Sequence, residues 1–523
     1  MPHTISQLLD GLDDAQRSAA SALEGPVRIS AVAGAGKTRT ITRRIAYGCE
    51  SGKWDPDRTA AVTFSVKATR EMQQRLSKLG AGRVQVATFH ALALSQLRQV
   101  WSEVTESYFP ELLTDASEIL EASVEHVTDL VGAGPRELRD LLGEVNWTKV
   151  SLIAPKDYER VCAAYHRVPP AGVSPAQMTS VLEDYERQKA ERNLIDFNDI
   201  LLILCHLIEE SDEVASRVRR QIGWLTVDEY QDVSPLQHRL MKLWLGNNTN
   251  ICVVGDPAQT IYSFAGATSY YLLDFAREFP QLRADIRLDT DYRSTPQIVG
   301  YANAVLEKSA VASDYVPLRS AQGQDKGAAV TTRAYGNDAL EARGVASAIR
   351  RLLDSGVEAS EIAVLSRINA QTRAVCAACD EASVPYVVRR MVGQGMDETS
   401  FSKAVRSGVE SGKIESLNTS MITVSTIHAS KGLEWDYVFI IGMSEGLLPF
   451  GIASGVPAEP GWNAAERGDD AAIEDVAAAA LEEERRLFYV GVTRGRKQVS
   501  LSFARKKDDS ASFERAPSRF LVR

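Results

Sequence analysis

The sequence predicts an α/β protein with two parallel sheets flanked by helices, and with an all-helical segment inserted into the first. Three observations lead to this prediction. A glycine-rich turn joins a strand to a helix near the N-terminus, apolar strands alternate with helices on both sides of a helical stretch, and a second block of alternating strands and helices begins near residue 284. Alternation of this kind is typical of doubly wound parallel sheets.

Composition places the chain among ordinary globular proteins. Of its 523 residues, 44% are hydrophobic and 24% are charged, and the formal net charge is −10. This charge argues against a uniformly basic nucleic-acid binder but leaves room for a local basic groove. No apolar run reaches the roughly 18 residues of a membrane span, and the first residues lack a secretory signal pattern. We therefore expect a cytoplasmic protein with no membrane partner.

The six cysteines favour the same compartment. Only Cys376 and Cys379 lie close together, within an expected helix, and no second Cys or His pair stands at the spacing of a metal site. Two buried thiols are the simpler interpretation, and a reducing cytoplasm agrees with it.

In the first half, strands and helices alternate on either side of a helical stretch. Between about 100 and 194 helical segments follow one another, with Pro and Gly breaks at 110, 132–135 and 169–175. The expected elements before this stretch are helices at 10–26, 39–46, 67–79 and 90–101 and strands at 27–30, 58–64 and 84–89. Strands at 224–228 and 250–255 follow it.

The second half predicts another sheet. Its expected strands are 328–334, 362–366, 385–388, 422–426, 437–441 and 498–503, and a helix is expected at about 369–383. Residues 451–480 begin as a loop rich in Ala, Gly and Pro and continue as a helix that reaches Tyr489. The expected domains are 1–99 with 195–283, the helical insertion 100–194, and 284–394 with 421–523, the last pair joined by a short connection at 395–420.

The glycine-rich turn has the pattern of a phosphate-binding P-loop. It reads VRISAVAGAGKTRTITRR over 27–44, with Gly34 and Gly36 permitting a tight turn before Lys37 and Thr38. Backbone N–H groups at a helix N-terminus bind phosphate, Lys37 can reach the β- and γ-phosphates, and the Thr38 hydroxyl can bind Mg²⁺. The first glycine of the strict pattern is Ala31 here, so a small-residue turn is the alternative. The strand before the turn and the helix after it disfavour that alternative.

Acidic residues follow the strand at 224–228. Asp228 and Glu229, in the segment DEYQD, stand where one carboxylate can hold Mg²⁺ and a neighbour can orient or deprotonate water. An isolated DEYQD is most often a solvated acidic turn, but a buried strand before it and a P-loop upstream favour catalysis.

Further candidates follow other strands. Gln259, in GDPAQ, can sense a γ-phosphate, although Gly-Asp-Pro alone indicates a turn. The aromatic residues Tyr262, Phe264, Phe64 and Phe89 can stack on bases without sequence preference, or can belong to the core.

Two arginines of the second block can act on a phosphate from across a cleft. Arg293 follows an expected strand, and Arg494 lies at the end of the helix that contains Tyr489. The loop 426–434, TIHASKGLE, places a His, a Lys and a Glu between them. A surface salt bridge is the simpler interpretation for either arginine taken alone.

Taken together, these segments resemble the superfamily 1A DNA helicases of the UvrD/Rep/PcrA type, over nearly the whole chain and in the family's motif order. The matching segments are LDDAQ with Gln16, AVAGAGKT, VTFSVKATREM, TFHALAL, IDFNDIL, TVDEYQD, VVGDPAQTIYSFAGA, DTDYRST, STIHASKGLEWDYVFI and EEERRLFYVGVTRGR.

The resemblance implies two RecA-like P-loop NTPase domains that use ATP and Mg²⁺. It assigns Thr38 and Asp228 to Mg²⁺, Glu229 as the catalytic base, and Gln259, Arg293 and Arg494 to the γ-phosphate. The remaining implied nucleotide contacts are Gln16, Ala33, Gly34, Ala35, Gly36, Lys37, Arg39, Tyr292 (adenine) and Glu434 (ribose). The implied DNA contacts are Phe64, Thr88, His90, Tyr262, Phe264 and His428.

The chain departs from the family pattern at three places. Val66 stands where the family has Asn, Phe264-Ala265 replace a Trp-Arg pair, and 395–420 is too short for the 2B domain found in relatives. We expect a 3′–5′ single-stranded DNA translocase and helicase of repair or recombination, acting on single strands and on 3′-tailed or forked duplexes. A motor that depends on a nuclease or repair-protein partner, as in antiphage systems, is the first alternative. A small-molecule kinase or NTP switch is the second, and it leaves the motifs after residue 255 unexplained.

Overall fold

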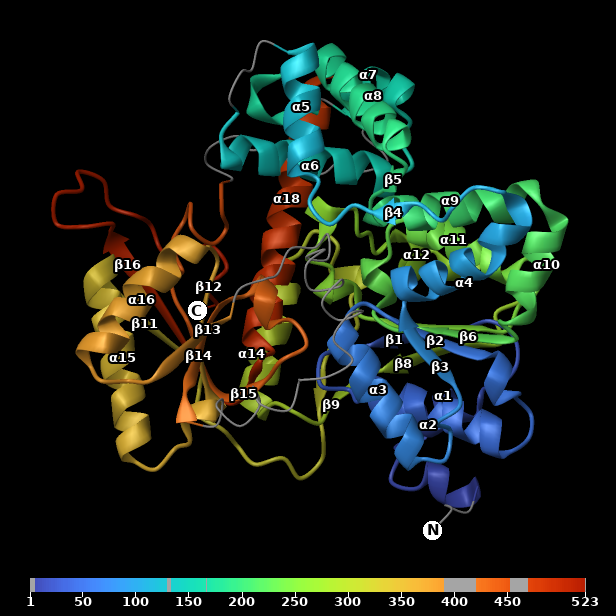
Figure 1. Cartoon of the computed structure of the whole chain (residues 1–523). Helices are drawn as coiled ribbons and strands as arrows, with labels where there is room; N and C mark the ends of the chain where they lie inside the picture. The colour runs from blue at the N-terminus through green and yellow to red at the C-terminus, as the bar shows by residue number, and fades with distance from the viewer. Residues whose placement is uncertain (1–4, 129–132, 166, 390–419, 452–468, 523) are drawn as a thin grey trace.

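The computed structural model describes residues 5–128, 133–165, 167–389, 420–451 and 469–522 (Figure 1). Its first sheet has the strand order β3-β2-β6-β7-β1-β8, and all neighbouring strands are parallel. The strands are β1 (Val27–Ala31), β2 (Thr59–Thr63), β3 (Gln85–Thr88), β6 (Trp224–Val227), β7 (Ile251–Gly255) and β8 (Ala284–Leu288).

Helices cover both faces of this sheet because its central strands are apolar on both sides. In β2, every residue is buried; Ala61 packs in the apolar cluster with α2 and α3, while Ala60 and Val62 pack in the cluster with α4, α9 and α11. The helices are α1 (Asp14–Ser21), α2 (Lys37–Glu50), α3 (Val66–Lys78), α4 (Phe89–Val104), α9 (Phe197–Glu210), α10 (Asp212–Arg220) and α11 (Pro235–Leu245).

The α-helices described in the insertion lie above this sheet (Figure 1). They are α5 (Ser117–Val127), α6 (Pro135–Val150), α7 (Tyr158–Tyr165) and α8 (Pro175–Glu191), and they enclose a separate apolar cluster. Two short parallel strands, β4 (Glu111–Leu112) and β5 (Leu194–Ile195), pair where the chain enters and leaves the insertion. Helix α4 runs past the expected boundary at residue 99, because its last turns still pack on the first domain.

The second sheet is also parallel throughout, in the order β11-β16-β15-β12-β14-β13. Helices α15 (Asp338–Asp354) and α16 (Asn369–Glu381) cover one face, and α14 (Pro296–Leu306) and α18 (Asp469–Val492) pack on the other. The strands are β11 (Thr331–Asn337), β12 (Ile362–Ser366), β13 (Tyr386–Arg389), β14 (Ile422–Thr426), β15 (Trp435–Ile440) and β16 (Gly495–Lys506).

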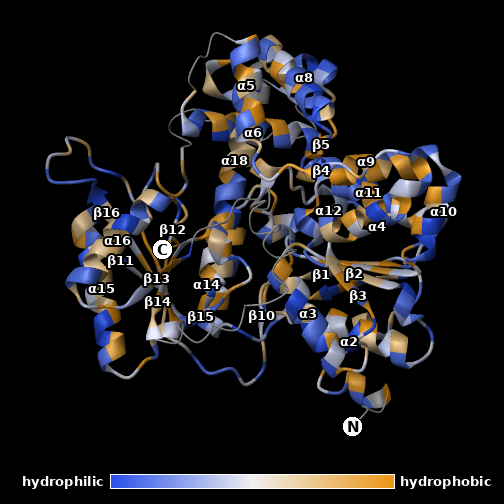
Figure 2. Cartoon of the chain, in the orientation of Figure 1, coloured by the Kyte–Doolittle hydropathy of each residue, from blue (hydrophilic) through white to orange (hydrophobic). Residues whose placement is uncertain are grey.

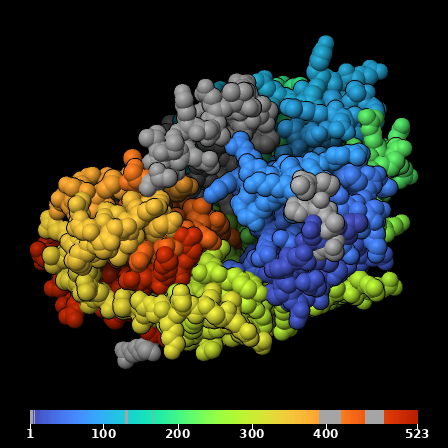
Figure 3. Space-filling model, turned by 90° about the horizontal axis from the view of Figure 1, so that it is seen from below, coloured from blue at the N-terminus to red at the C-terminus, as the bar shows by residue number. Residues whose placement is uncertain are grey.

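The two sheets share one core. A single apolar cluster runs from β1 and α2 to α14 and α18, so the blocks lie side by side, as the view from below also shows (Figure 3). Hydrophobic residues concentrate on the strands, while the helices alternate hydrophobic and hydrophilic positions (Figure 2).

The predicted fold class is confirmed, and the structure corrects two details. Strand β8 pairs with β1, so the first sheet extends to Leu288, past the expected boundary at 283. Strand β11 lies three residues later than the strand expected at 328–334. The expected short connection at 395–420 lies outside the described residues except for its last residue. Of the loop and helix expected over 451–480, the structure describes residue 451 and helix α18 from Asp469 onward. None of the described helices is long and apolar enough to cross a membrane.

The cysteines, all within the described ranges, are free thiols. Cys379 is buried and Cys376 is half-buried on α16, and burial raises the pKa of Cys379 to about 12.

Candidate nucleotide and nucleic-acid sites

The P-loop joins β1 to α2 at the carboxyl edge of the first sheet. Gly34 and Gly36 have φ of 73° and 75°, in the left-handed region that favours glycine. Lys37 opens α2, and its Nζ lies 3.3 Å from the carbonyl oxygen of Val32. Gln16 donates from Nε2 to the carbonyl of Ala35 at 3.0 Å. The residues expected to bind a nucleotide from LDDAQ and from the P-loop therefore lie together.

Asp228 and Glu229 follow β6 at the same edge. The Asp228 N–H still donates to Val62 at 2.9 Å, so its position is fixed by the sheet. Glu229 donates its N–H to Asp228 Oδ1 at 2.9 Å and has a φ of 50°. A non-glycine residue in this region is strained, and such strain clusters at functional sites.

The pKa values of the two carboxyl groups are shifted in opposite directions. Burial, and then the charge of Glu229, raises the pKa of Asp228 to about 7. Burial alone would raise the pKa of Glu229 as well, but Lys37 and Lys431 outweigh it and lower that pKa. A buried carboxylate beside a second negative charge, with the Thr38 hydroxyl at the start of α2, offers the hard oxygen ligands that Mg²⁺ prefers. The donor set therefore fits the expected metal.

Arg293 of the second block points into the same region. Asp291, at the end of β9 (Thr290–Asp291), accepts hydrogen bonds at Oδ1 from the N–H groups of Arg293 (2.6 Å) and Ser294 (3.1 Å). The Arg293 guanidinium pairs with Glu434 at 2.5 Å and donates to the Thr493 carbonyl at 3.3 Å. Glu434, expected at the ribose, thus also orients an arginine.

Arg494, at the C-terminal end of α18, is fully buried and held by backbone carbonyls. It donates from Nε to Val490 at 3.0 Å and from Nη1 to Leu433 at 3.1 Å, which leaves Nη2 3.5 Å from Gln259 Oε1. Burial, and then repulsion from Arg293, lowers its pKa to about 10. The guanidinium of Arg494, in the second block, therefore lies within hydrogen-bonding distance of the side chain of Gln259, in the first block.

Other contacts between the blocks were not assigned from sequence. Lys431 pairs with Asp232 and donates to the Gln259 carbonyl at 2.6 Å. Tyr489 donates to Asp256 Oδ2 at 3.4 Å. The sequence signalled Lys431 only as part of the loop 426–434, and no local pattern could pair it with a residue 199 positions away.

The outer rim of the nucleotide region carries Tyr292 and Arg39. Tyr292 is 49% exposed, and its hydroxyl donates to the carboxylate of Asp13. Arg39 donates to the Gly11 carbonyl at 2.8 Å. An exposed aromatic ring beside Gln16's helix is suitably placed to stack on a base.

Three of the expected DNA-contact residues form one aromatic group across the two blocks. The ring centroids of Phe264 and His428 are 5.9 Å apart, Tyr262 and Phe264 are 6.2 Å apart, and the Tyr262 hydroxyl donates to the His428 carbonyl at 3.2 Å. Phe264 is 52% exposed. This group offers a stacking face to a base.

The other expected DNA contacts lie on the first block. Phe64 is half-buried, 6.2 Å from Phe89 in an edge-on arrangement. Thr88 caps α4, accepting at Oγ1 from the Ala91 N–H at 3.2 Å. His90 stacks on Phe197 with a centroid distance of 3.9 Å.

Phe89 could have stacked on a base according to the sequence, but it is a core residue. It is 2% exposed and stacks on Trp244 at 5.7 Å.

Comparisons with known proteins cover nearly the whole chain. Residues 12–280 match the UvrD/REP helicase N-terminal domain, and residues 286–394 and 402–506 match the UvrD-like helicase C-terminal domain. The chain is 35% identical over 595 residues to the ATP-dependent DNA helicase UvrD2 of Mycobacterium tuberculosis (strain H37Rv), covering 98% of this chain and 81% of the relative. It is 30% identical over 381 residues to the ATP-dependent DNA helicase PcrA of Bacillus subtilis, covering 72% of this chain and 50% of that relative.

Proposed function

Because the chain belongs to the UvrD/REP helicase family, we propose that it is an ATP-dependent DNA helicase. In this proposal it translocates 3′ to 5′ along single-stranded DNA and acts in DNA repair or recombination. The observation that carries the proposal is the meeting of Arg494 from the second block with Gln259 from the first, beside the P-loop, the buried Asp228 and the half-buried Glu229.

The first block, built on the first sheet, and the second block, built on the second sheet, are the two lobes of this proposal, and each contributes groups to ATP hydrolysis. Lys37 neutralises the phosphates and Glu229, kept ionised by its lysine neighbours, takes the proton of the attacking water. Arg293 and Arg494 stabilise charge on the γ-phosphate from the second lobe, the contribution that an arginine finger makes in other P-loop enzymes. Gln259 reports the state of the γ-phosphate to the aromatic group around Phe264.

Thr38 and Asp228 would hold Mg²⁺, which neutralises phosphate charge when bound. Gln16 and Tyr292 would contact adenine, and Glu434 the ribose. The main chain of the P-loop, Ala33 to Gly36, would donate to phosphate oxygens, and Arg39 would border the nucleotide.

Movement would follow from closure and opening of the cleft. ATP draws the arginines of the second lobe toward the phosphates, and hydrolysis releases them. The DNA contacts at Phe64, Thr88 and His90 and the aromatic group Tyr262–Phe264–His428 would hold one strand while the lobes step along it. In this proposal the first lobe is the domain that the family calls 1A, the second lobe is its domain 2A, and residues 100–194 are its helical domain 1B.

The test is steady-state ATP hydrolysis with and without a single-stranded oligonucleotide, for the wild type and for Glu229→Gln. Strong stimulation by DNA that the substitution abolishes supports a DNA-driven motor, whereas a rate indifferent to DNA contradicts it. Strand displacement on duplexes with a 3′ or a 5′ tail tests the polarity: a preference for the 5′ tail would refute the 3′–5′ assignment.

A second candidate is a motor that needs a nuclease or repair-protein partner for unwinding. The alignment to UvrD2 is longer than this chain, so that relative contains segments which this chain lacks. If the candidate is correct, the isolated protein hydrolyses ATP with single-stranded DNA but separates a 3′-tailed duplex poorly. Efficient unwinding by the isolated protein would exclude it.

A further inference from the structure

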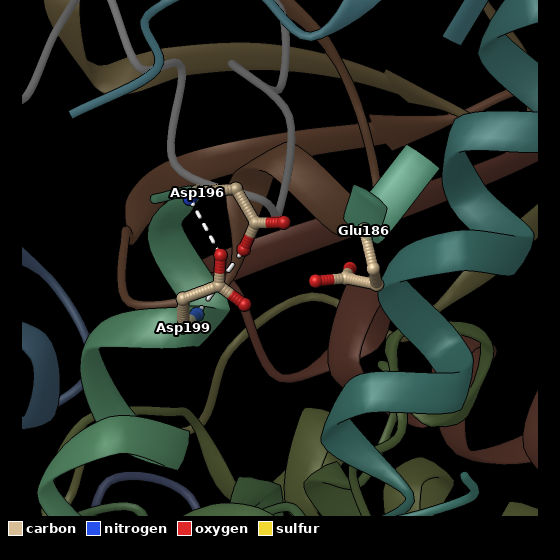
Figure 4. A group of neighbouring side chains, drawn as sticks. All are labelled: Glu186, Asp196 and Asp199. Atoms are coloured by element: carbon tan, nitrogen blue, oxygen red, sulfur yellow. Dashed lines mark hydrogen bonds between the residues drawn. The ribbon is translucent and has the colours of Figure 1, made fainter. Parts of the chain in front are cut away.

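A cluster of five charges, all buried except the half-exposed Glu186, lies where the helical insertion joins the first lobe. Three of its members are carboxylates, Glu186, Asp196 and Asp199, whose oxygens lie within 4.8 Å of one another (Figure 4). Two lysines, Lys149 and Lys189, fill the space among them. These five side chains form an ion-pair network. The two ammonium groups occupy the positions among the carboxylates at which a divalent cation would bind.

The lysines contact the carboxylates at short range. Lys149 Nζ is 2.6 Å from Asp199 Oδ1 and 2.7 Å from Glu186, and it also pairs with Asp196. Lys189 Nζ is 2.5 Å from Asp199 Oδ2 and 2.8 Å from Asp196. The side chains of Lys149 and Lys189 are 9% and 2% exposed. Removing one partner of such a buried network leaves an uncompensated charge, so its geometry is strongly held.

The network connects three helices from two parts of the fold. Lys149 is the penultimate residue of α6 and Lys189 lies near the end of α8, both in the insertion. Asp196 caps α9 of the first lobe, accepting from the N–H groups of Asn198 at 3.0 Å and Asp199 at 3.1 Å. The orientation of the insertion on the lobe therefore depends on these contacts.

The first turn of α9 extends the network to one expected DNA contact. Phe197 stacks on His90 at 3.9 Å, and Asn198 donates to Asn146 Oδ1 of α6 at 2.8 Å. A shift of α9's first turn would move His90.

The end of α6 connects the network to the second set of expected DNA contacts, the aromatic group Tyr262, Phe264 and His428. Val150, next to Lys149, packs on Gly266, where an added Cβ would lie only 2.5 Å from Val150 Cγ2. Gly266 follows directly the turn η7 (Ser263–Ala265), which carries the exposed Phe264. The backbone of this loop thus rests on the residue beside Lys149.

We propose that Lys149 and Lys189 are positioning residues for DNA: their network with Asp196 and Asp199 sets His90 and the Phe264 loop in register for one bound strand. This inference rests on the proposed function and adds to it the residues that align the two stacking groups. Neither lysine touches the nucleotide region, so the network acts on DNA affinity and not on the unstimulated hydrolysis of ATP.

The test measures binding of a fluorescently labelled single-stranded oligonucleotide by anisotropy, together with ATP hydrolysis in the absence of DNA. Lys189→Met is expected to weaken DNA binding about tenfold, the size of effect typical of coupled positions without ligand contact, with the DNA-free rate unchanged. The double variant Lys189→Met/Asp199→Asn restores the net charge of the network and should recover most of the affinity. Lys156→Met removes an exposed lysine of the same insertion and serves as the matched control.

The outcomes separate the two proposals. Wild-type protein that fails to bind the oligonucleotide refutes the proposed function and this inference with it. If the wild type binds the oligonucleotide and Lys189→Met binds it with the same affinity, the inference is overturned and the proposed function stands. The same conclusion follows if the double variant binds the oligonucleotide as weakly as Lys189→Met. If Lys189→Met does not fold, Lys189→Arg carries the same comparison, because it keeps the charge but changes the geometry; undiminished affinity there would overturn the inference.

Discussion

Replacing Gly34 by alanine should uncouple the two lobes. A methyl group on Gly34 would overlap Asp291 Oδ1 and lie 2.6 Å from Asp291 Cγ. Since carbon atoms in contact stand about 3.5–4.0 Å apart, the two segments must separate by about 1 Å. Asp291 Oδ1 accepts from the N–H groups of Arg293 and Ser294, so the separation would displace Arg293 from the phosphates.

The magnitude follows from that displacement. A misplacement of about 1 Å near a reacting centre costs roughly 100-fold in rate, so we expect DNA-stimulated kcat to fall by about that factor. The left-handed φ of 73° adds a backbone cost of about 1–2 kcal/mol to the free energy of folding.

Gly52→Ala isolates this backbone cost. Gly52 has a φ of 71°, and among the described residues no atom lies within 4 Å of a Cβ placed there. The assay compares kcat and KM for ATP with saturating single-stranded DNA, and urea unfolding of both variants. If Gly34→Ala loses stability like Gly52→Ala but keeps wild-type kcat, the reasoning about Asp291 and Arg293 is wrong.

Three further predictions concern the same cleft and its rim. Glu229→Gln should lower DNA-stimulated ATP hydrolysis by about 10²–10⁴ while a fluorescent ATP analogue still binds; loss of that binding instead would point to a structural role. Lys431→Met should leave Asp232 buried without its cation and cost about 3–5 kcal/mol of unfolding free energy. Lys431→Met/Asp232→Asn should recover most of it, and an equally unstable double variant would contradict the pairing. Burial, and then Arg367 and Lys431, lowers the pKa of His428 to about 3. At His428 the unfolded chain therefore binds a proton below about pH 6.5 that the folded chain does not, which should lower stability by about 1.4 kcal/mol per pH unit from pH 6.5 toward pH 3. Burial also lowers the pKa of His90 to about 3, so that His90 adds a similar contribution. His428→Gln should therefore reduce the slope by its own share in urea titrations at pH 5–7, whereas His206→Gln, at an exposed site on α9, should leave it unchanged.

Much of the fold could be predicted because parallel α/β sheets have local signals. The apolar strands at 362–366 and 422–426 have the same bounds in the structure, β12 (Ile362–Ser366) and β14 (Ile422–Thr426), since each is a short, fully buried strand in the middle of the sheet. The sequence indicates a strand before Arg293 but not its membership of the first sheet, because the residues of β8 alternate between partial burial and exposure at the sheet edge and give a weak apolar signal.

Candidate residues at strand ends were also accessible from sequence. In parallel sheets the carboxyl ends of strands share one edge, so Lys37, Asp228 and Gln259 could be expected to converge before any coordinates were known. The environment of the aromatic residues could not be predicted in this way. Phe89 and Phe264 look alike in sequence, yet Phe89 is in the core and Phe264 is half exposed.

Consecutive residues are enough to establish the class of protein, the motif order and the residue types of the nucleotide region, because a strand, a turn and a helix each leave a local pattern. How the lobes and the insertion communicate depends on contacts that form only in the folded chain. The approach of Gly34 to Asp291, the pair of Lys431 with Asp232, and the support of the Phe264 loop by Val150 all join residues distant in the chain. Such contacts depend on how separate elements pack, and no periodicity within one element records which distant side chain will fill the space beside it.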